Sequence, residues 1–221
     1  TYRSESVRLA WPATWMFLGF DLAMSSHGDK PLNRWQDAFI PMRLAQSLSE
    51  TKLPNGKALV SDVQNVLPHK LPTPPDEMPD WSLQATFIGI ALALLFSLAG
   101  QKPRLFNALT LGFWFISGLI GSALLAIWLA TEHYFVHGNE NILLFSPLAW
   151  LCIILFLLRN RSPKWLSAFH LTVKLVAALA ALAVIIKLLP LPQQSNINWL
   201  LMFLPVHWAI TRQINKASVN K

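Results

Sequence analysis

The most polar stretch beside an apolar run, residues 131–141, holds the side chains best suited to metal or acid–base chemistry. His133 and His137 are four residues apart, so on a helical end they would share one face. With Glu132 or Glu140 they could supply nitrogen and oxygen ligands to zinc. A solvated loop at the membrane surface is the other interpretation. Because a two-His spacing alone is weak support for zinc, no metal or cofactor is predicted.

Asn139 and Asn141 lie in the same loop, just before an apolar run. Asparagine favours turns and helix N-caps, where its side chain bonds to nearby backbone groups. The candidate loop site therefore comprises Glu132, His133, His137, Asn139 and Asn141.

A second candidate pair, His170 and Lys174, lies inside an apolar run at helical spacing. A charge in a membrane helix is a functional hypothesis by default, and here it would fit a small transporter. Lys174 is also about two turns from the end of the run, so its ammonium could reach the interface instead. No inverted repeat is present in the sequence, which weakens the transporter hypothesis.

The remaining reactive side chains form no recognisable catalytic set. Asp21, His27 and Asp29 could do acid–base work, but their spacing is not diagnostic. The one cysteine, Cys152, lies in an apolar run and is interpreted as a small buried side chain. The sequence contains no phosphate-binding glycine loop, no nucleophile elbow and no His-Glu-x-x-His motif.

The elements that carry these residues are predicted to be membrane helices. The chain is 53% hydrophobic and only 13% charged, and about 20 apolar residues cross a bilayer core. We expect an all-α membrane protein with about five transmembrane helices in 82–211. The approximate spans are 83–100, 105–131, 142–158, 165–189 and 197–211, the last being short and containing Pro205.

Charge placement predicts the orientation of these helices. Residues 1–80 have eight Lys/Arg against nine Asp/Glu, whereas residues 81–221 have ten against two. The basic residues of the second part fall in alternate loops, which by the positive-inside rule are cytoplasmic. We therefore expect a multi-pass protein of the bacterial inner membrane, with a periplasmic N-terminal region and a cytoplasmic tail at 212–221. The formal charge of +7 is thus no sign of nucleic-acid binding.

The N-terminal region, 1–67, is predicted to be a small mixed periplasmic segment. Residues 32–50 show helical spacing that Pro41 breaks or kinks. A turn at 54–57 could join two short strands. Residues 68–81 read as a proline-rich linker. Because the chain begins at Thr1 without a Met or a signal peptide, we expect it to be the C-terminal part of a larger protein.

Small residues in the second span predict close helix packing. Ser117, Gly118, Gly121 and Ser122 give the small-xxx-small spacing that lets backbones approach. The alanine-rich stretch 177–183 could be the partner. Alternatively, these residues are simply common in membrane helices.

Several short stretches resemble the C-terminal half of the Lnb-type bacterial membrane proteins. In the N-terminal region they are Thr1-Tyr2-Arg3, Trp15, Leu18 to Ala23, Asp29 to Leu32, Ala38 to Pro41, Leu44, Asn55-Gly56 and Leu59-Val60. In the membrane part they are Trp128, Thr131, His133, Asn139 to Leu144 and Pro147.

The resemblance implies a function as well as a fold. Members of this family are implicated in lipoprotein N-acylation, in which a periplasmic Cys thiol with a His base passes an acyl group from phospholipid to a lipoprotein amine. In that pattern the Cys and His lie upstream of Thr1. This chain would then be the membrane-anchoring part, with an upstream catalytic domain, phospholipid and lipoprotein as partners. The alternatives are a non-enzymatic anchor or assembly subunit and, less favoured, a small transporter.

Overall fold

The N-terminal part of the chain folds into short helices in two pairs. The computed structural model describes residues 1–64, 66–67, 70 and 72–219, so the predicted linker at 68–81 and the predicted tail at 212–221 lie partly outside the described residues. The elements are α1 (Tyr2–Leu9), α2 (Thr14–Ala23), η1 (Ser26–Asp29), α3 (Arg34–Asp37) and α4 (Pro41–Glu50). Pro41 occupies the first turn of α4, where its missing N–H costs nothing, so the break predicted there is confirmed.

The predicted pair of short strands is not confirmed. Lys52 and Ala58 form a single antiparallel bridge, and the residues that the structure describes contain no strand. The turn itself forms as expected, with Gly56 at φ +80° and Asn55 Oδ1 accepting from Lys57 N at 3.0 Å. Two strands this short have no neighbouring sheet on which to pack, so the pairing stops after one bridge.

The membrane part consists of long helices beginning at Ser82. Its elements are α5 (Ser82–Ala99), α6 (Pro103–Ala130), η2 (Tyr134–Val136), α7 (Asn141–Leu144), α8 (Ala149–Leu158), α9 (Pro163–Ile185), η3 (Ile186–Leu188) and α10 (Ile197–Val219). Four described segments are long and apolar enough to cross a membrane: α5, α6, α7 with α8, and α9 with η3. Helix α10 is a fifth long helix, and the predicted tail continues it as far as Val219.

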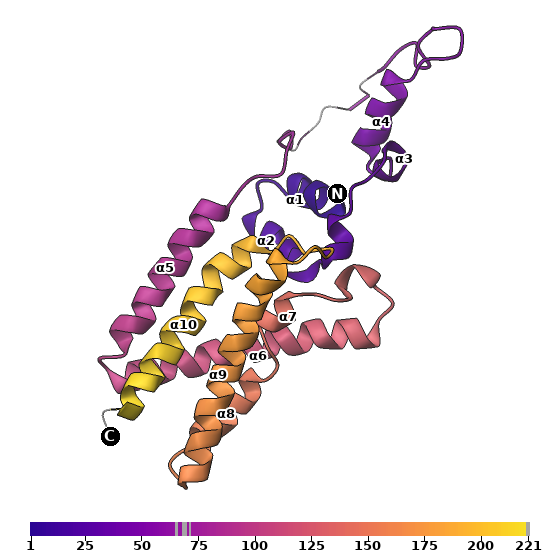
Figure 1. The fold of residues 1–221 in the computed structure, drawn as a ribbon. Helices are drawn as coiled ribbons and strands as arrows, with labels where there is room; N and C mark the ends of the chain where they lie inside the picture. Colours follow the sequence, from indigo (N-terminus) through magenta and orange to yellow (C-terminus); the bar gives the residue numbers. More distant parts are fainter. Residues whose placement is uncertain (65, 68–69, 71, 220–221) are drawn as a thin grey trace.

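The bundle has two distinct ends (Figure 1). Helices α1 and α2 lie at the end where α5 and α10 begin, and we call this end the N-terminal side. Helix α10 ends at the opposite end. Helix α6 runs across the bundle, inclined to α5, α9 and α10. At 1.5 Å per residue its 28 residues measure about 42 Å, which exceeds a core of about 30 Å, so tilt accommodates the excess.

The third predicted span, 142–158, is not one continuous helix. It breaks between α7 and α8, where Pro147 cannot donate a backbone hydrogen bond. The carbonyls freed by the break need other partners inside the bundle. His207 Nε2 of α10 donates to Leu144 O at 2.9 Å, and this bond holds α10 against the broken segment.

The small residues of α6 pack against this broken segment. An added Cβ at Gly121 would lie 1.7 Å from Phe145 O, and one at Gly118 would lie 2.8 Å from the Trp150 ring. Trp150 Nε1 donates to Ser122 Oγ at 3.0 Å. The small residues of α6 therefore approach the α7–α8 segment, whereas the sequence pattern suggested residues 177–183 as their partner.

Helices α5 and α10 meet through a matching feature. Pro205 lies inside α10 and has no N–H, so the Leu201 carbonyl one turn earlier lacks its usual donor. Gly89 of α5 faces that carbonyl, and an added Cβ would lie 2.0 Å from it. Glycine therefore lets α5 pack directly on the interrupted part of α10.

Candidate functional site

The most buried charged group of the protein is the Arg3 guanidinium on α1. Its side chain is 1% exposed, and it makes a two-point contact with Asp29, through Nε to Oδ1 at 2.7 Å and Nη2 to Oδ2 at 2.9 Å. Nη1 also lies 3.4 Å from Asp21 Oδ1. Paired contacts of this kind fix both the position and the orientation of the guanidinium.

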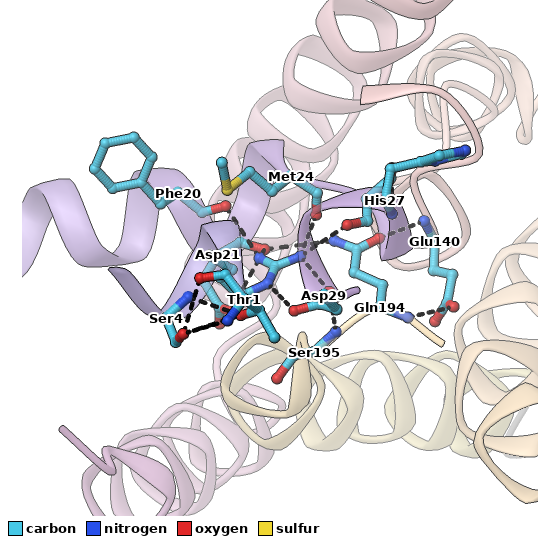
Figure 2. Close-up of polar contacts among 12 residues, drawn as sticks. Thr1, Ser4, Phe20, Asp21, Met24, His27, Asp29, Glu140, Gln194 and Ser195 are labelled. Carbon is cyan, nitrogen blue, oxygen red and sulfur yellow. Dashed lines mark hydrogen bonds and ion pairs between the residues drawn. The ribbon is translucent and has the colours of Figure 1, made fainter. Parts of the chain in front are cut away.

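Arg3 also closes the C-terminal end of α2. Its N–H groups donate to the backbone oxygens of Phe20, Asp21, Met24 and Ser25 (Figure 2). The last carbonyls of a helix have no partner within the helix and carry partial negative charge, so a cation there is favourable. Arg3 thus ties α1, α2 and η1 into one unit.

Amide side chains from the membrane part bind the same end of α2. Asn139 Nδ2 donates to Leu22 O at 2.9 Å and to Ala23 O at 2.8 Å. Asn141 Nδ2 donates to Leu22 O at 2.9 Å and to Asp21 O at 3.3 Å. Both amides are buried. The loop before α7 is therefore bonded directly to the N-terminal part.

The loop before α10 completes this arrangement. Gln194 Nε2 donates to Asp21 O at 3.4 Å, and Ser195 N donates to Asp29 Oδ2 at 2.9 Å (Figure 2). Asn198 Nδ2 lies 3.5 Å from Asp21 Oδ2. We call this set the junction; it consists of Arg3, Asp21, Asp29, Asn139, Asn141, Gln194, Ser195 and Asn198.

A second ion pair joins the two loops to each other. Lys187 Nζ contacts Glu140 Oε2 and the Gln194 carbonyl. Glu140 and Gln194 also exchange two bonds, Gln194 N to Glu140 Oε1 at 2.9 Å and Glu140 N to Gln194 Oε1 at 2.7 Å. The membrane part therefore presents a fixed polar surface to α2.

The two carboxylates of the junction, Asp21 and Asp29, lie in different electrostatic surroundings. Burial raises the pKa of Asp21 to about 6, although Arg3 and the Asn198 amide act in the opposite direction. Asp29 holds the two-point contact with Arg3. Asp21 is therefore protonated more easily than an ordinary aspartate.

The chain belongs to a known membrane family. Residues 81–217, more than half of the sequence, match the family model of the Lnb transmembrane domain. This is an Lnb-family protein. The matched five-helix domain includes α10, so the predicted number of membrane helices is confirmed. No curated protein and no solved structure matches the chain.

The junction crosses the boundary of the Lnb transmembrane domain. Asn139, Asn141 and Gln194 lie within the matched residues, whereas Arg3 and Asp29 lie outside them. The hydrogen bonds described above therefore join the Lnb domain to a segment that the family match does not cover. The contacts of the junction are hydrogen bonds and ion pairs, and they attach one part of the chain to the other.

The candidate loop site is divided by the structure. Asn139 and Asn141 enter the junction, and Glu140 pairs with Lys187. Glu132 and His133 are exposed, and His137 Nε2 donates to Thr131 O at 3.0 Å. Among the described residues no three His, Cys, Asp or Glu side chains are grouped to hold a metal ion.

The other sequence candidates also occupy ordinary positions. Lys174 is on the exposed face of α9, and the half-buried His170 ring packs on Phe169. His27 Nδ1 lies 3.1 Å from Ser25 Oγ, a pairing that resembles a nucleophile and its base. Ser25 is fully buried, however, and Asp29 is bound to Arg3, so no catalytic triad is formed.

Sequence reasoning missed Arg3, Gln194 and Asn198 as site residues. The available signal was the amide-rich stretch 193–198 placed directly before a membrane helix. Amides that enter a bilayer boundary need protein partners, because apolar surroundings cannot satisfy them. Cys152 is fully buried, in agreement with its interpretation as a packing residue.

Proposed function

We propose that this chain is the membrane anchor of an Lnb-type protein and that it holds an extracytoplasmic segment at a fixed place on the membrane surface. The observation that carries the proposal is the junction. The backbone oxygens at the end of α2 are bound at once by Arg3 and by side chains of the Lnb domain. A flexible tether would need none of these contacts.

Charge placement supports a bacterial inner-membrane location with the N-terminal side in the periplasm. The loops at the opposite end carry Lys102, Arg104, Arg159, Arg161 and Lys164. On the N-terminal side Lys187 is paired with Glu140, so its charge is balanced locally. The positive-inside rule then places the C-terminus in the cytoplasm.

The family resemblance supports lipoprotein N-acylation as the reaction that the anchor serves. A phospholipid donor and a lipoprotein acceptor would both be met at the membrane surface where the junction lies. The thiol and its base would come from an upstream segment, because Cys152 is buried among α6, α8 and α9 side chains. This chain would contribute position rather than reactive groups.

The test compares two arginine variants of the full-length protein in its native cells. Arg3→Met breaks the junction, whereas Arg34→Met changes an exposed arginine of the same N-terminal part. We expect both to remain in the membrane, with lipoprotein N-acylation, read by mass spectrometry of lipoprotein N-termini, reduced only in Arg3→Met. Unchanged N-termini after deletion of the whole gene would refute the acyl-transfer part and leave the anchor role standing.

A non-enzymatic assembly subunit is the second candidate, and α3 with α4 favours it. Trp35 is 86% exposed, and Leu44 and Leu48 of α4 are also exposed. Exposed apolar side chains on an amphipathic helix are typical of a protein contact. Co-purification of one stoichiometric partner, lost in a Trp35→Ser and Leu48→Ser double variant, would support this candidate. Recovery of the protein alone would count against it.

A further inference from the structure

The segment from Trp11 to Phe20 is unusually apolar for a part of the chain outside the membrane helices. Its ten residues carry no charge. Trp11 and Trp15 are 44% and 75% exposed, and Gly19 is exposed one turn after Trp15. Trp15 and Gly19 are four apart and share one face of α2, and Trp11 lies in the turn that precedes this helix. We call this surface the Trp11–Gly19 face.

The opposite side of the segment is fixed to the protein. Phe17 is buried and its ring stacks on Trp81, with centroids 5.9 Å apart. The ionisable residues that flank the segment, Arg8 and Asp21, are both buried. The rest of the protein therefore leaves Trp11 and Trp15 uncovered, and this segment has no charged side chain beside them.

Three contacts fix the position of α2 relative to the membrane helices. Phe17 meets Trp81, the residue before α5. Trp199 Nε1, near the start of α10, donates to Leu18 O at 3.3 Å. Asn141, the first residue of α7, donates to Leu22 O. Helix α2 therefore lies beside the starts of α5, α7 and α10 (Figure 1).

A shallow apolar hollow joins this segment to the residues just before α5. It is lined by Val7, Ala10, Trp11, Phe17, Pro79 and Trp81. Leu83 and Phe87 near the start of α5 are 65% and 64% exposed, as is typical of lipid-facing residues. Trp11 therefore lies beside the point where the chain enters its first membrane helix.

We infer that the Trp11–Gly19 face lies in the interfacial layer of the bilayer on the N-terminal side and contacts lipid there. Tryptophan prefers this layer because its ring is apolar and its N–H is polar. An interfacial helix needs one apolar face and lies flat against the membrane. The uncovered tryptophans supply the apolar face, and Trp11 lines the same hollow as Trp81, the residue before α5, so the protein contacts lipid beside the junction.

The test places a spin label at matched positions of the full chain in phosphatidylcholine–phosphatidylglycerol vesicles. Trp15→Cys places the label on the Trp11–Gly19 face. Trp35→Cys places it at an exposed position of α3, and Phe87→Cys places it at an exposed position of the membrane helix α5 as a lipid-facing reference. Unsubstituted protein controls for Cys152, which is buried. Collision rates of each label with oxygen and with a water-soluble nickel complex are measured by electron paramagnetic resonance.

We expect the ratio of oxygen to nickel collisions at residue 15 to be several-fold higher than at residue 35 and close to that at residue 87. A ratio at residue 15 equal to that at residue 35 would overturn the inference, because the face would then meet water or a protein. Gly19→Cys gives a second reading of the same face, since an added Cβ there meets nothing within 4 Å. Both labels must agree for the inference to stand.

Discussion

The two helix pairs of the N-terminal part use the same chemistry in opposite environments. In the first pair Arg3 contacts Asp21 and Asp29 with its side chain 1% exposed. In the second pair Arg34 contacts Glu50 with its side chain 71% exposed. The first pair is bonded to the membrane part through amides of two loops, whereas α3 and α4 project away from it (Figure 1).

The difference teaches that burial, not the ion pair itself, decides what an arginine does here. Water screens the exposed Arg34–Glu50 pair and can hydrogen-bond each partner instead. Losing this pair therefore costs little stability. The Arg3 pair has no such alternative, because its removal leaves carboxylates and backbone oxygens uncompensated. We call α3, α4 and the turn up to residue 60 the arm.

The largest effect is expected from Arg3→Met. Breaking a buried pair by removing one partner costs about 3–5 kcal/mol. We therefore expect α2 amides to lose hydrogen-exchange protection and residues 10–30 to become sensitive to protease. Arg34→Met, with its exposed pair, is the control. Equal protection of α2 in the two variants would remove the distinction between the junction and the arm.

The next largest effect is expected at one of two glycines of α6, the one that another segment approaches closely. Gly121→Ala places a Cβ 1.7 Å from Phe145 O, so the backbones must separate at a cost of about 1–3 kcal/mol. Gly112→Ala, on the same helix, meets nothing within 4 Å. Thermal unfolding in detergent should show a lower Tm for Gly121→Ala alone. An equal Tm would mean that α6 does not pack closely on the α7–α8 segment.

Asn141→Ala should weaken the junction by less than Arg3→Met. It removes two bonds to the end of α2 and leaves the buried Asn196 Nδ2 without the Asn141 Oδ1 acceptor, a cost of about 1–3 kcal/mol. His133→Ala changes an exposed residue of the same loop and serves as the control. Protease release of the N-terminal part should rise only for Asn141→Ala. Similar release from both variants would assign the attachment to other contacts.

The smallest effect concerns pH. The folded pKa of Asp21, about 6, lies above its ordinary value of 3.8. A group of this kind stabilises the fold fully below the ordinary pKa, and the contribution is lost as pH rises through the folded pKa. The junction should therefore be more resistant to protease at pH 4 than at pH 7. Asp21→Asn should abolish most of this change; an undiminished change would assign it to another group.

The membrane helices could be predicted from sequence because lipid demands long apolar runs. The starts and ends of α5 and α6 fall within two residues of the predicted spans. The break between α7 and α8 was missed because the residues on both sides of Ser146-Pro147 are apolar and form a run long enough for one span. The His207 bond and the Gly121 contact hold the broken segment in place, and both depend on distant parts of the chain.

The junction could be predicted only in part. Asn139 and Asn141 stood out as polar residues beside an apolar run, and the turn expected there forms, with Asn139 Oδ1 accepting from Asn141 N at 2.9 Å. Their bonds to the end of α2 were not expected. Arg3 did not stand out in the sequence, because its partners lie 18 and 26 residues away and its burial depends on the docking of α2. A single charged residue in a polar segment gives no local sign that it will be buried.

The central claim is that the junction locks α1 and α2 onto the Lnb domain, whereas the arm projects away from that domain and is joined to α1 by the Arg43–Glu5 ion pair. Hydrogen exchange of the full chain in lipid nanodiscs tests it most directly, by comparing residues 14–24 with residues 41–50. The account predicts slow exchange at 14–24, fast exchange at 41–50, and loss of the slow exchange in Arg3→Met. Equally fast exchange of both segments in the unsubstituted protein would contradict it.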